Sequence, residues 1–422
     1  MTVRSGAGQG LAPEFEGAPG NLEPMAITPE RLGSAPPSPA LWRDPRVRAI
    51  AYQVLTLVGV VAFAAYITHN TIDNLHRQGI ASGFGFLDKP AGFGIPQALI
   101  EYSELSPNSR VFWVGLLNTL LVAVVGIALA TILGFVIGLA RLSSNWLMAQ
   151  LATAYIEIIR NIPVLLQILF WYFAVLQALP QPRDSMAFLG DLFFLNNRGF
   201  YTPKPVFEAG FGWVVLAFLV ALAAVIGIAH WARQRREATG QPFHTVFVGV
   251  GLLVGLSLLA FVLTGMPLTF EHAEMGRFKL QGGLVLLPEL VALTLALSLY
   301  TAAFIAEIVR AGILSVSHGQ IEAAHALGLR HGQTLRLVVI PQALRVIIPP
   351  LTSQYLNLTK NSSLAVAIGY PDFVNLFTGI VLNQTGQAVE VIAMTMGVYL
   401  TLSLLTSAFM NWYNRRIALV ER

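Results

Sequence analysis

The feature that most constrains this chain is a series of long segments without charged side chains. Residues 111–140 contain no Asp, Glu, Lys or Arg. About 20 consecutive apolar residues are enough for a helix to cross the hydrocarbon core of a bilayer. Only 11% of the 422 residues are charged, whereas soluble domains carry about 25%. The sequence therefore predicts an all-α integral membrane protein.

About eight spans are expected from the apolar runs. They cover residues 49–70, 111–140, 155–179, 210–229, 243–270, 284–310, 346–359 and 391–413. The seventh run is too short for a straight span and contains Pro349 and Pro350, so we expect it to be interrupted. Gly126, Gly134 and Gly138 in the second run are expected to let another helix approach closely.

Arginine-rich connections predict the orientation, because Lys and Arg concentrate in cytoplasmic loops. With eight spans, the connections at 141, 230–236, 310–345 and 415–416 all fall on one side, which is then the cytoplasm. Both termini are expected on that side. Residues 1–48, rich in Pro, Gly and Ala, are expected to form a disordered cytoplasmic tail, and residues 49–109 the first span and an external loop.

The sequence lacks the residues that several classes of function require. The chain has no cysteine, and its eight histidines show no metal-ligand spacing, so we expect no metal and no cofactor. None of the four lysines follows a glycine, which excludes a GxxxxGK[ST] phosphate loop and ATP hydrolysis by that route. The net charge of +4 comes mostly from arginines beside apolar runs, which fits membrane topology better than nucleic-acid binding.

Residues 322–345 interrupt this apolar pattern. They read EAAHALGLRHGQTLRLVVIPQALR and are basic and only half apolar. Ser317 and Gln320 have the spacing of a capping box, which predicts a helix starting near His318. Gly328 is expected to end that helix, and a second amphipathic segment then leads to Pro341.

Two charged groups near span ends allow two interpretations each. Glu157 and Arg160 lie one turn apart before Pro163, either as an ion pair beside a tolerated kink or as part of a gate. Glu307 either faces the pore or pairs with Arg310 at the cytoplasmic end of its span. Charges at the edge of a span cost less than charges at its centre, so an ion pair at either place needs no special function.

The interrupting segment carries a known pattern: Glu322-Ala323-Ala324, three residues, Gly328, nine residues, then Val338-x-Ile340-Pro341. It resembles the EAA loop of the membrane subunits of bacterial ABC importers. The segments YTAAFIAEIVRAGILSV (300–316), NTLLVAVVGIALATILGFVIGLARLS (118–143) and YIEIIRNIPVLLQ (155–167) are similar to the polar amino acid branch, the histidine and glutamine type of permease. The resemblance covers residues 111–179 and 284–416.

The resemblance implies a type I importer permease core made of spans 2, 3, 6, 7 and 8, within a transmembrane domain at 110–416. Span 1 is then an addition, and residues 180–283 insert an external loop and a helix pair. This long architecture is similar to the membrane subunits of general L-amino-acid importers. Residues 311–345 become the cytoplasmic coupling loop.

The same resemblance implies partners and roles. A pair of ATPase subunits would bind ATP, a second permease subunit (by analogy a paralogue) would complete the pore, and a periplasmic binding protein would deliver polar L-amino acids. The chain itself would be a non-catalytic subunit in a bacterial inner membrane. Ala323, Ala324 and Leu327 would pack into the ATPase, and Glu322 would pair with Arg330. The implied coupling residues are Glu322, Ala323, Ala324, Gly328, Arg330 and Pro341.

Candidates for the substrate path come from polar groups near the expected interruption. Lys360 follows a short helix and can face the pore and attract a carboxylate, or extend to the membrane interface. Related permeases often have Lys-Asp-Thr-Ser here, whereas this chain has Asn361 in place of the aspartate, which would suit broad or neutral-to-acidic substrates. The full candidate set is Lys360, Asn361, Ser362, Ser363, Glu307, Gln167 and Asn118.

Two other classes of function remain as alternatives. An ion-coupled secondary amino acid transporter would need intramembrane carboxylates, and the spans hold almost none. A membrane-embedded enzyme would need a cluster of acid, base or metal-ligating residues, which the sequence does not show. Copurification with an ATPase separates the importer from both.

Overall fold

The computed structural model describes residues 45–77, 82–241, 243–276 and 280–417. The chain divides into two units, residues 1–74 and 75–422, which are described separately. Helix α1 (Pro45–Arg77) contains the expected first span and is longer than it at both ends. Residues 1–44 of the predicted tail lie outside the described residues.

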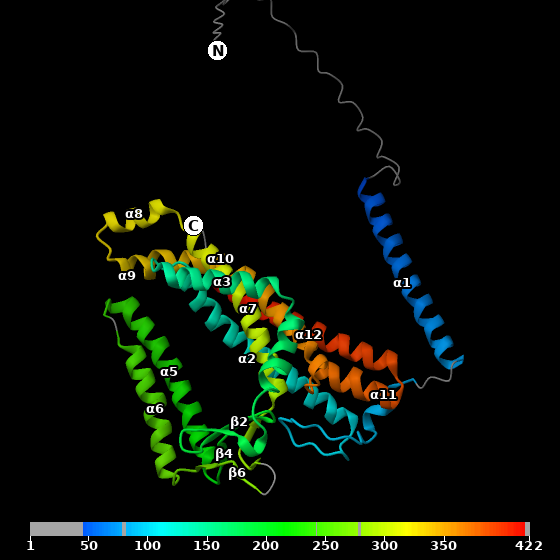
Figure 1. The fold of residues 1–422 in the computed structure, drawn as a ribbon. Helices are drawn as coiled ribbons and strands as arrows, with labels where there is room; N and C mark the ends of the chain where they lie inside the picture. The colour runs from blue at the N-terminus through cyan, green and yellow to red at the C-terminus, as the bar shows by residue number, and fades with distance from the viewer. Residues whose placement is uncertain (1–44, 78–81, 242, 277–279, 418–422) are drawn as a thin grey trace, which may run out of the picture. The chain divides into compact units, whose positions relative to one another are not determined.

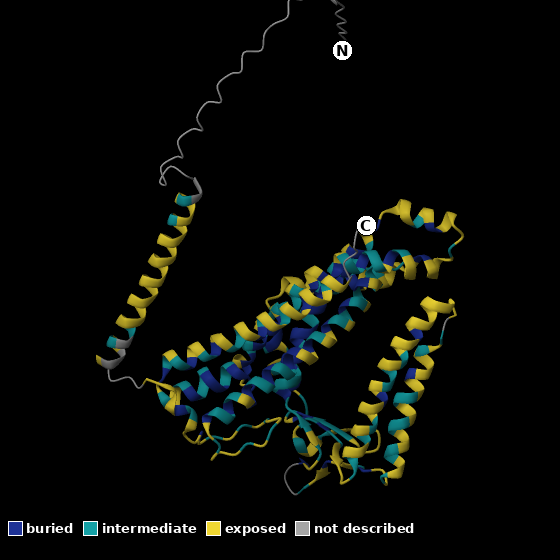
Figure 2. Cartoon of the chain, turned by 180° about the vertical axis from the view of Figure 1, so that it is seen from behind, coloured by how far each residue is buried: buried dark blue, intermediate teal, exposed yellow. Residues whose placement is uncertain are grey.

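The second unit is a helical bundle built around α2 (Asn108–Arg141) and α7 (Pro288–Leu314), which pack along each other. Helices α10 (Ile340–Asn361) and α12 (Ala388–Ile417) complete it (Figure 1). Buried residues concentrate in these helices (Figure 2). The described residues hold seven helices long and apolar enough to span a membrane, or eight if one bent pair counts as a span. The prediction of a helical membrane protein with about eight spans is confirmed.

Glycines allow α2 and α7 to approach closely. A Cβ atom on Gly134 would lie 2.5 Å from Ile305 Cγ2, and one on Gly138 would lie 2.8 Å from the Ala306 carbonyl oxygen. Any larger side chain would force the helices apart, because packed interiors leave no room for added atoms. Gly126 likewise faces Leu358 of α10 at 3.2 Å. The predicted role of these three glycines is confirmed.

The third expected span is sharply broken. Helix α3 (Trp146–Asn161) ends before Pro163, and α4 (Val164–Leu169) with the π-helical turn η3 (Phe170–Leu176) continues at 105° to it. Proline lacks the backbone N–H and disfavours helical geometry at the preceding residue. Gln167 stabilises the break, since its amide nitrogen donates to the carbonyl oxygens of Ile159 and Ile162, each at 2.9 Å.

The predicted interruption of the seventh span is wrong. One helical stretch runs over residues 331–368, including α10 and the 3₁₀ helix η6 (Ser362–Ile368), and Pro349 and Pro350 lie inside α10. Packing holds the helix through the prolines: Ile347 and Ile348 are buried, and a Cβ atom on Gly312 of α7 would meet Ile347 at 2.3 Å. Prolines are tolerated in membrane helices where neighbouring helices support the backbone.

Residues 180–287 form an insert with strands as well as a helix pair. Helices α5 (Phe211–Thr239) and α6 (Thr245–Leu263) pack against each other. The expected fifth run, 243–270, is therefore too long, because its last residues enter a strand. The strands are β1 (Met186–Phe188), β2 (Phe193–Asn196), β3 (Gly199–Thr202), β4 (Lys204–Phe207), β5 (Leu268–Glu271), β6 (Glu274–Met275), β7 (Leu280–Gln281) and β8 (Leu284–Leu286).

Strands before the helix pair bond to strands after it. One antiparallel sheet has the order β1-β2-β3-β8, and β4 pairs with β5, and β6 with β7. Phe200 of β3 lies opposite Leu286 of β8, directly before α7 begins. This pairing ties the insert to the core at one end of the bundle, which we call the strand end (Figure 1).

Candidate functional site

The segment that interrupts the apolar pattern lies at the end of the bundle opposite the strands (Figure 1). It consists of α8 (His318–Ala326), α9 (His331–Thr334) and the π-helical turn η5 (Leu335–Val339), which continues into α10. The sequence located the start of α8 correctly. Its N-cap Ser317 makes no side-chain cap bond, so the expected capping box is not formed there.

Gly328 ends α8 in a Schellman motif. The Gly328 N–H donates to the His325 carbonyl at 2.9 Å, and the Leu329 N–H donates to the Ala324 carbonyl at 3.2 Å. The motif needs a left-handed residue after the helix, and Gly328 has φ of +77°. Glycine adopts this conformation without the strain that a Cβ atom brings. The predicted helix stop at Gly328 is confirmed.

The exposed side of α8 differs from the predicted one. Ala324 is buried, whereas Glu322, Ala323, Ala326 and Leu327 are exposed. The grouping of Ala324 with Ala323 and Leu327 is wrong, because Ala324 is turned inward while the other two point outward. Leu327 is 83% exposed. The helix therefore presents small side chains and one projecting leucine to its surroundings.

The charged groups of this segment also pair differently from the prediction. Glu322 accepts from His318 Nδ1 at 3.2 Å, one turn earlier on α8, so the predicted Glu322–Arg330 pair is wrong. Arg330 is the N-cap of α9, and its N–H donates to Gln333 Oε1 at 2.9 Å.

Pro341 lies in the first turn of α10, directly after the π-helical turn. A π turn widens the helix, which accommodates the missing N–H of proline.

An ionic cluster joins α2 and α7 at the same end of the bundle. Glu307 accepts from Arg310 Nη2 at 2.6 Å and is also paired with Arg141. The Glu307–Arg310 pair that the sequence offered is thus present. The guanidinium of Arg160 lies 5.0 Å from the centroid of the Phe304 ring. Among the described residues Glu157 makes no ion pair with Arg160, so the ion-pair interpretation, one of the two offered for these residues, is wrong.

Asn118 lies near the strand end and binds backbone. Its amide nitrogen donates to the carbonyl oxygens of Gln97 at 3.0 Å and Pro371 at 2.9 Å. The neighbouring Thr119 hydroxyl accepts from the Phe373 N–H at 3.0 Å. Asn118 and Thr119 are both buried. They hold the turn after η6 against α2.

Lys360 and Ser363 line a recess of about 490 Å³ between the end of α10 and α12. Thr395, Met396 and Tyr399 of α12 form its other wall. Lys360 is exposed, while Ser362 is buried with its hydroxyl donating to the Thr359 carbonyl at 2.7 Å. In the described structure, no hydrogen bond or ion pair connects Lys360, Asn118, Gln167 and Glu307 with one another.

Asp372 is a buried polar residue that was not predicted from the sequence as a site residue. Its carboxylate accepts from the Asn375 N–H at 2.8 Å and from the Tyr399 hydroxyl at 3.1 Å. Aspartate is a preferred N-cap, and the order Pro371-Asp372 before an apolar segment is a signal that could have identified it. Because Tyr399 also lines the recess, Asp372 helps to fix the recess wall.

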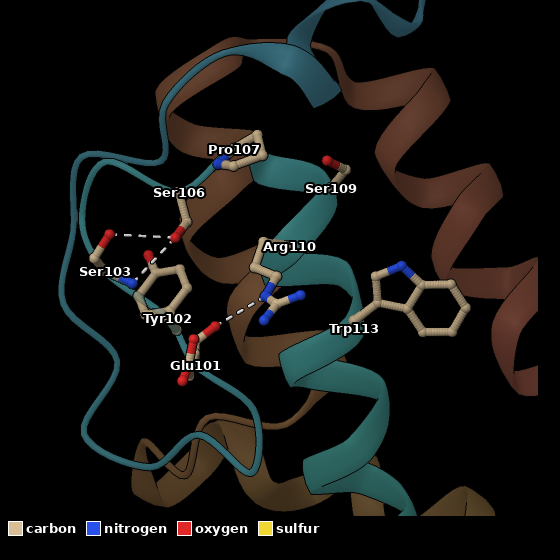
Figure 3. A pocket seen from close by; sticks show the side chains of 8 residues that line it. All are labelled: Glu101, Tyr102, Ser103, Ser106, Pro107, Ser109, Arg110 and Trp113. Atoms are coloured by element: carbon tan, nitrogen blue, oxygen red, sulfur yellow. Dashed lines mark hydrogen bonds between the residues drawn. The ribbon is translucent and has the colours of Figure 1, made fainter.

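A separate hollow of about 660 Å³ lies at the start of α2 (Figure 3). Arg110 Nε donates to the Glu101 carbonyl at 2.8 Å, and the Ser103 and Ser106 hydroxyls lie 3.3 Å apart. Figure 3 shows Trp113 on the side of α2 away from the Ser103 loop. The lining comes from residues 101–113 alone, so this hollow is a local feature of one loop and one helix.

Comparison with known proteins identifies the family. The family model described as "binding-protein-dependent transport system inner membrane component" matches residues 241–419. The general L-amino acid transport system permease AapQ of Rhizobium johnstonii is 58% identical over 90% of this chain and 94% of its own length. The chain belongs to the amino-acid ABC transporter permeases.

Two further relatives have the same long architecture. The putative amino-acid ABC transporter permease YhdX of Escherichia coli is 57% identical over 90% of this chain and 97% of its own length. The glutamate/glutamine/aspartate/asparagine transport system permease BztB of Rhodobacter capsulatus is 42% identical over 93% of this chain and 100% of its own length. This permease is therefore a multi-span membrane protein of an ABC transport system, and the family resemblance seen in the sequence is confirmed.

Proposed function

We propose that this permease is one of two membrane subunits of an ATP-driven importer for polar L-amino acids, with broad or neutral-to-acidic preference. Relatives that match almost their whole length carry names of general L-amino acid and glutamate/glutamine/aspartate/asparagine systems. The second membrane subunit is a paralogue, a periplasmic binding protein delivers the substrate, and the membrane is the bacterial inner membrane. The strand end is external, and α8 and both termini are cytoplasmic.

The exposed face of α8 carries this proposal. Glu322, Ala323, Ala326 and Leu327 lie open on a helix held by the Schellman motif at Gly328 and by contacts with α9 and η5. Small side chains let a helix sit close to a partner's groove, and an apolar residue such as Leu327 gains free energy when it is covered. This exposed face of α8 binds the ATPase subunit. Arg330 and Pro341 fix the path of the chain from α8 into α10.

In this proposal, ATP hydrolysis takes place in the partner ATPase subunits. The chain contains no GxxxxGK[ST] phosphate loop, so the ATPase dimer binds and hydrolyses ATP, and this subunit is non-catalytic and needs no cofactor. Closure of the ATPase dimer moves α8. Because α8 leads through α9 and η5 into one helical stretch that reaches residue 368, that movement is passed to the substrate path.

We assign the substrate path to the recess beside Lys360. The Lys360 ammonium supplies a positive charge for a substrate carboxylate, and Asn361, Ser362 and Ser363 continue the polar stretch at the end of α10. Asn361 in place of an aspartate removes a negative charge that would favour cationic substrates. The positions of Asn118, Gln167 and Glu307 support structural roles rather than substrate contact, since their side chains bind backbone carbonyls or arginines.

The test is amino-acid uptake by the reconstituted complex in proteoliposomes. A panel of amino acids is expected to stimulate ATP hydrolysis, and uptake is expected only with ATP. Lys360→Ala is expected to weaken uptake of acidic amino acids, whereas Lys204→Ala, in strand β4 of the insert, is the control that leaves it unchanged. Uptake by this chain alone without ATP would refute the proposed importer. Unchanged selectivity in Lys360→Ala would show that the recess is not part of the substrate path.

A further inference from the structure

A polar cavity of about 500 Å³ lies where the insert meets the permease core at the external end. Its lining comes from segments far apart in sequence, and it includes Tyr172, Gln177, Asn197, Arg198, Glu289 and Pro371. Sites for small molecules typically enclose about 300–1,000 Å³ and carry a few converging polar groups. Unlike the hollow of Figure 3, this cavity exists only because the insert folds onto the core.

Two opposite charges line this cavity without forming a pair. Glu289 accepts from the Tyr172 hydroxyl at 2.8 Å, and it lies in the first turn of α7, where the helix dipole favours a carboxylate. Arg198 lies in the turn between β2 and β3 and is exposed. Within the described residues no ion pair or side-chain hydrogen bond is formed by the Arg198 guanidinium. Both charges are therefore available to a ligand.

The fold fixes the position of the turn that carries Arg198 relative to Glu289. Gly199, next to Arg198, has φ of +141°, and a Cβ atom there would lie 2.6 Å from the Leu286 carbonyl oxygen. Leu286 is three residues before Glu289, and it pairs with Phe200 across the β3–β8 ladder. The Arg198 N–H also donates to Asn196 Oδ1 at 2.8 Å. The turn is thus locked onto the start of α7.

An unsatisfied acceptor gives independent evidence for a ligand. Asn197 lines the cavity, and its side-chain oxygen is buried with no hydrogen-bond partner in the described structure. A buried acceptor left unpaired destabilises the structure, because it has lost its hydrogen bonds to water. A ligand with an N–H donor would satisfy it. The cavity thus offers one cation, one anion and one free acceptor.

We propose that this cavity binds a free amino acid at the external face, with its carboxylate at Arg198 and its ammonium at Glu289 and Asn197. A ligand of one charge would satisfy only one of the two charged residues, whereas a zwitterion satisfies both. The inference rests on the proposed function and adds a second binding position, distinct from the recess beside Lys360. It gives the insert a role, which is to supply Arg198.

The test is equilibrium binding of radiolabelled L-glutamine to the purified permease complex without the binding protein. Arg198→Gln and Glu289→Gln are each expected to weaken binding by about tenfold or more, since charge-assisted hydrogen bonds are lost. Glu289→Asp, which keeps the charge, is expected to retain binding. Arg110→Gln is the matched control, because it removes an external arginine from the separate hollow. N-acetyl-L-glutamine is expected not to compete.

Unchanged glutamine binding in both Arg198→Gln and Glu289→Gln would overturn the inference, and so would competition by N-acetyl-L-glutamine as strong as that by L-glutamine. A loss of binding in Glu289→Asp or Arg110→Gln equal to that in Glu289→Gln would also overturn it, because the effect would then not be specific to the charge. The binding readout requires no transport. Failure of ATP-dependent uptake by the wild-type complex would therefore refute the proposed importer while leaving the cavity to be decided by binding.

Discussion

At the scale of single residues, three kinds of glycine have different roles in this permease. Gly134 and Gly138 are needed for space, because α7 lies within 3 Å of where a Cβ atom would be. Gly328 is needed for its left-handed backbone, with open space around it. Gly251 in α6 has neither constraint, since nothing lies within 4 Å and its φ is ordinary. The sequence predicted the roles of Gly134, Gly138 and Gly328, but the absence of any constraint at Gly251 is seen only in the structure.

These differences predict the effect of adding one methyl group. Gly138→Ala is expected to lower the free energy of unfolding by about 1–3 kcal/mol, because the methyl group overpacks the contact with Ala306 and Val309. Gly251→Ala is expected to be neutral or slightly stabilising, since alanine has the higher helix propensity. Thermal unfolding of the two variants in the same detergent measures the difference. Equal unfolding temperatures would contradict the close packing of α2 and α7.

At the scale of helices and strands, the long apolar runs predicted the spans because uncharged segments of this length have few alternatives in a membrane protein. The strands of the insert were not predicted, since segments of two to four residues are too short to show alternation. The continuous helix through Pro349 and Pro350 was not predicted either. Its stability depends on Ile347 packing against Gly312, a contact between segments that sequence patterns do not connect.

In the candidate site too, features set by neighbouring residues were predicted and features set by contacts between distant segments were not. The local pattern around Gly328 predicted the end of α8, because a Schellman motif depends on neighbouring residues. Which side of α8 is buried depends on contacts with α9 and η5, so the orientation of Ala324 was missed. The Arg198–Glu289 cavity could not be predicted, since it depends on the pairing of β3 with β8 across the intervening helix pair.

The proposed sidedness of the helix ends can be tested directly because the chain has no cysteine. Ser103→Cys, on an exposed loop residue near the start of α2, is expected to react with a membrane-impermeant maleimide added outside the inner membrane. His325→Cys, exposed on α8, is expected to react only after the membrane is permeabilised. Labelling of both from the same side would contradict the arrangement in which the strand end is external and α8 cytoplasmic.

At the scale of the whole molecule, the two ends of the second unit have different tasks. The strand end carries the cavity with Arg198 and Glu289, and the opposite end carries the exposed face of α8. Helices α7 and α10 connect them, since α8 leaves α7 and returns into α10. In the proposed function, movement of α8 acts on both helices at once, and this couples ATP hydrolysis to transport.

The most direct measurement of this coupling is the uptake of amino acids, with ATP hydrolysis measured in parallel, by complexes that carry Gly328→Asp or Gly332→Asp. An aspartate at 328 adds a Cβ atom to a left-handed residue and places a negative charge at the C-terminus of α8, where the helix dipole opposes it. At Gly332, in the first turn of α9, the same side chain has ordinary φ, open space and a favourable dipole. We predict that Gly328→Asp is inserted but loses ATP-dependent uptake, whereas Gly332→Asp retains it. Wild-type uptake by an assembled Gly328→Asp complex would contradict the assignment of α8 as the coupling helix.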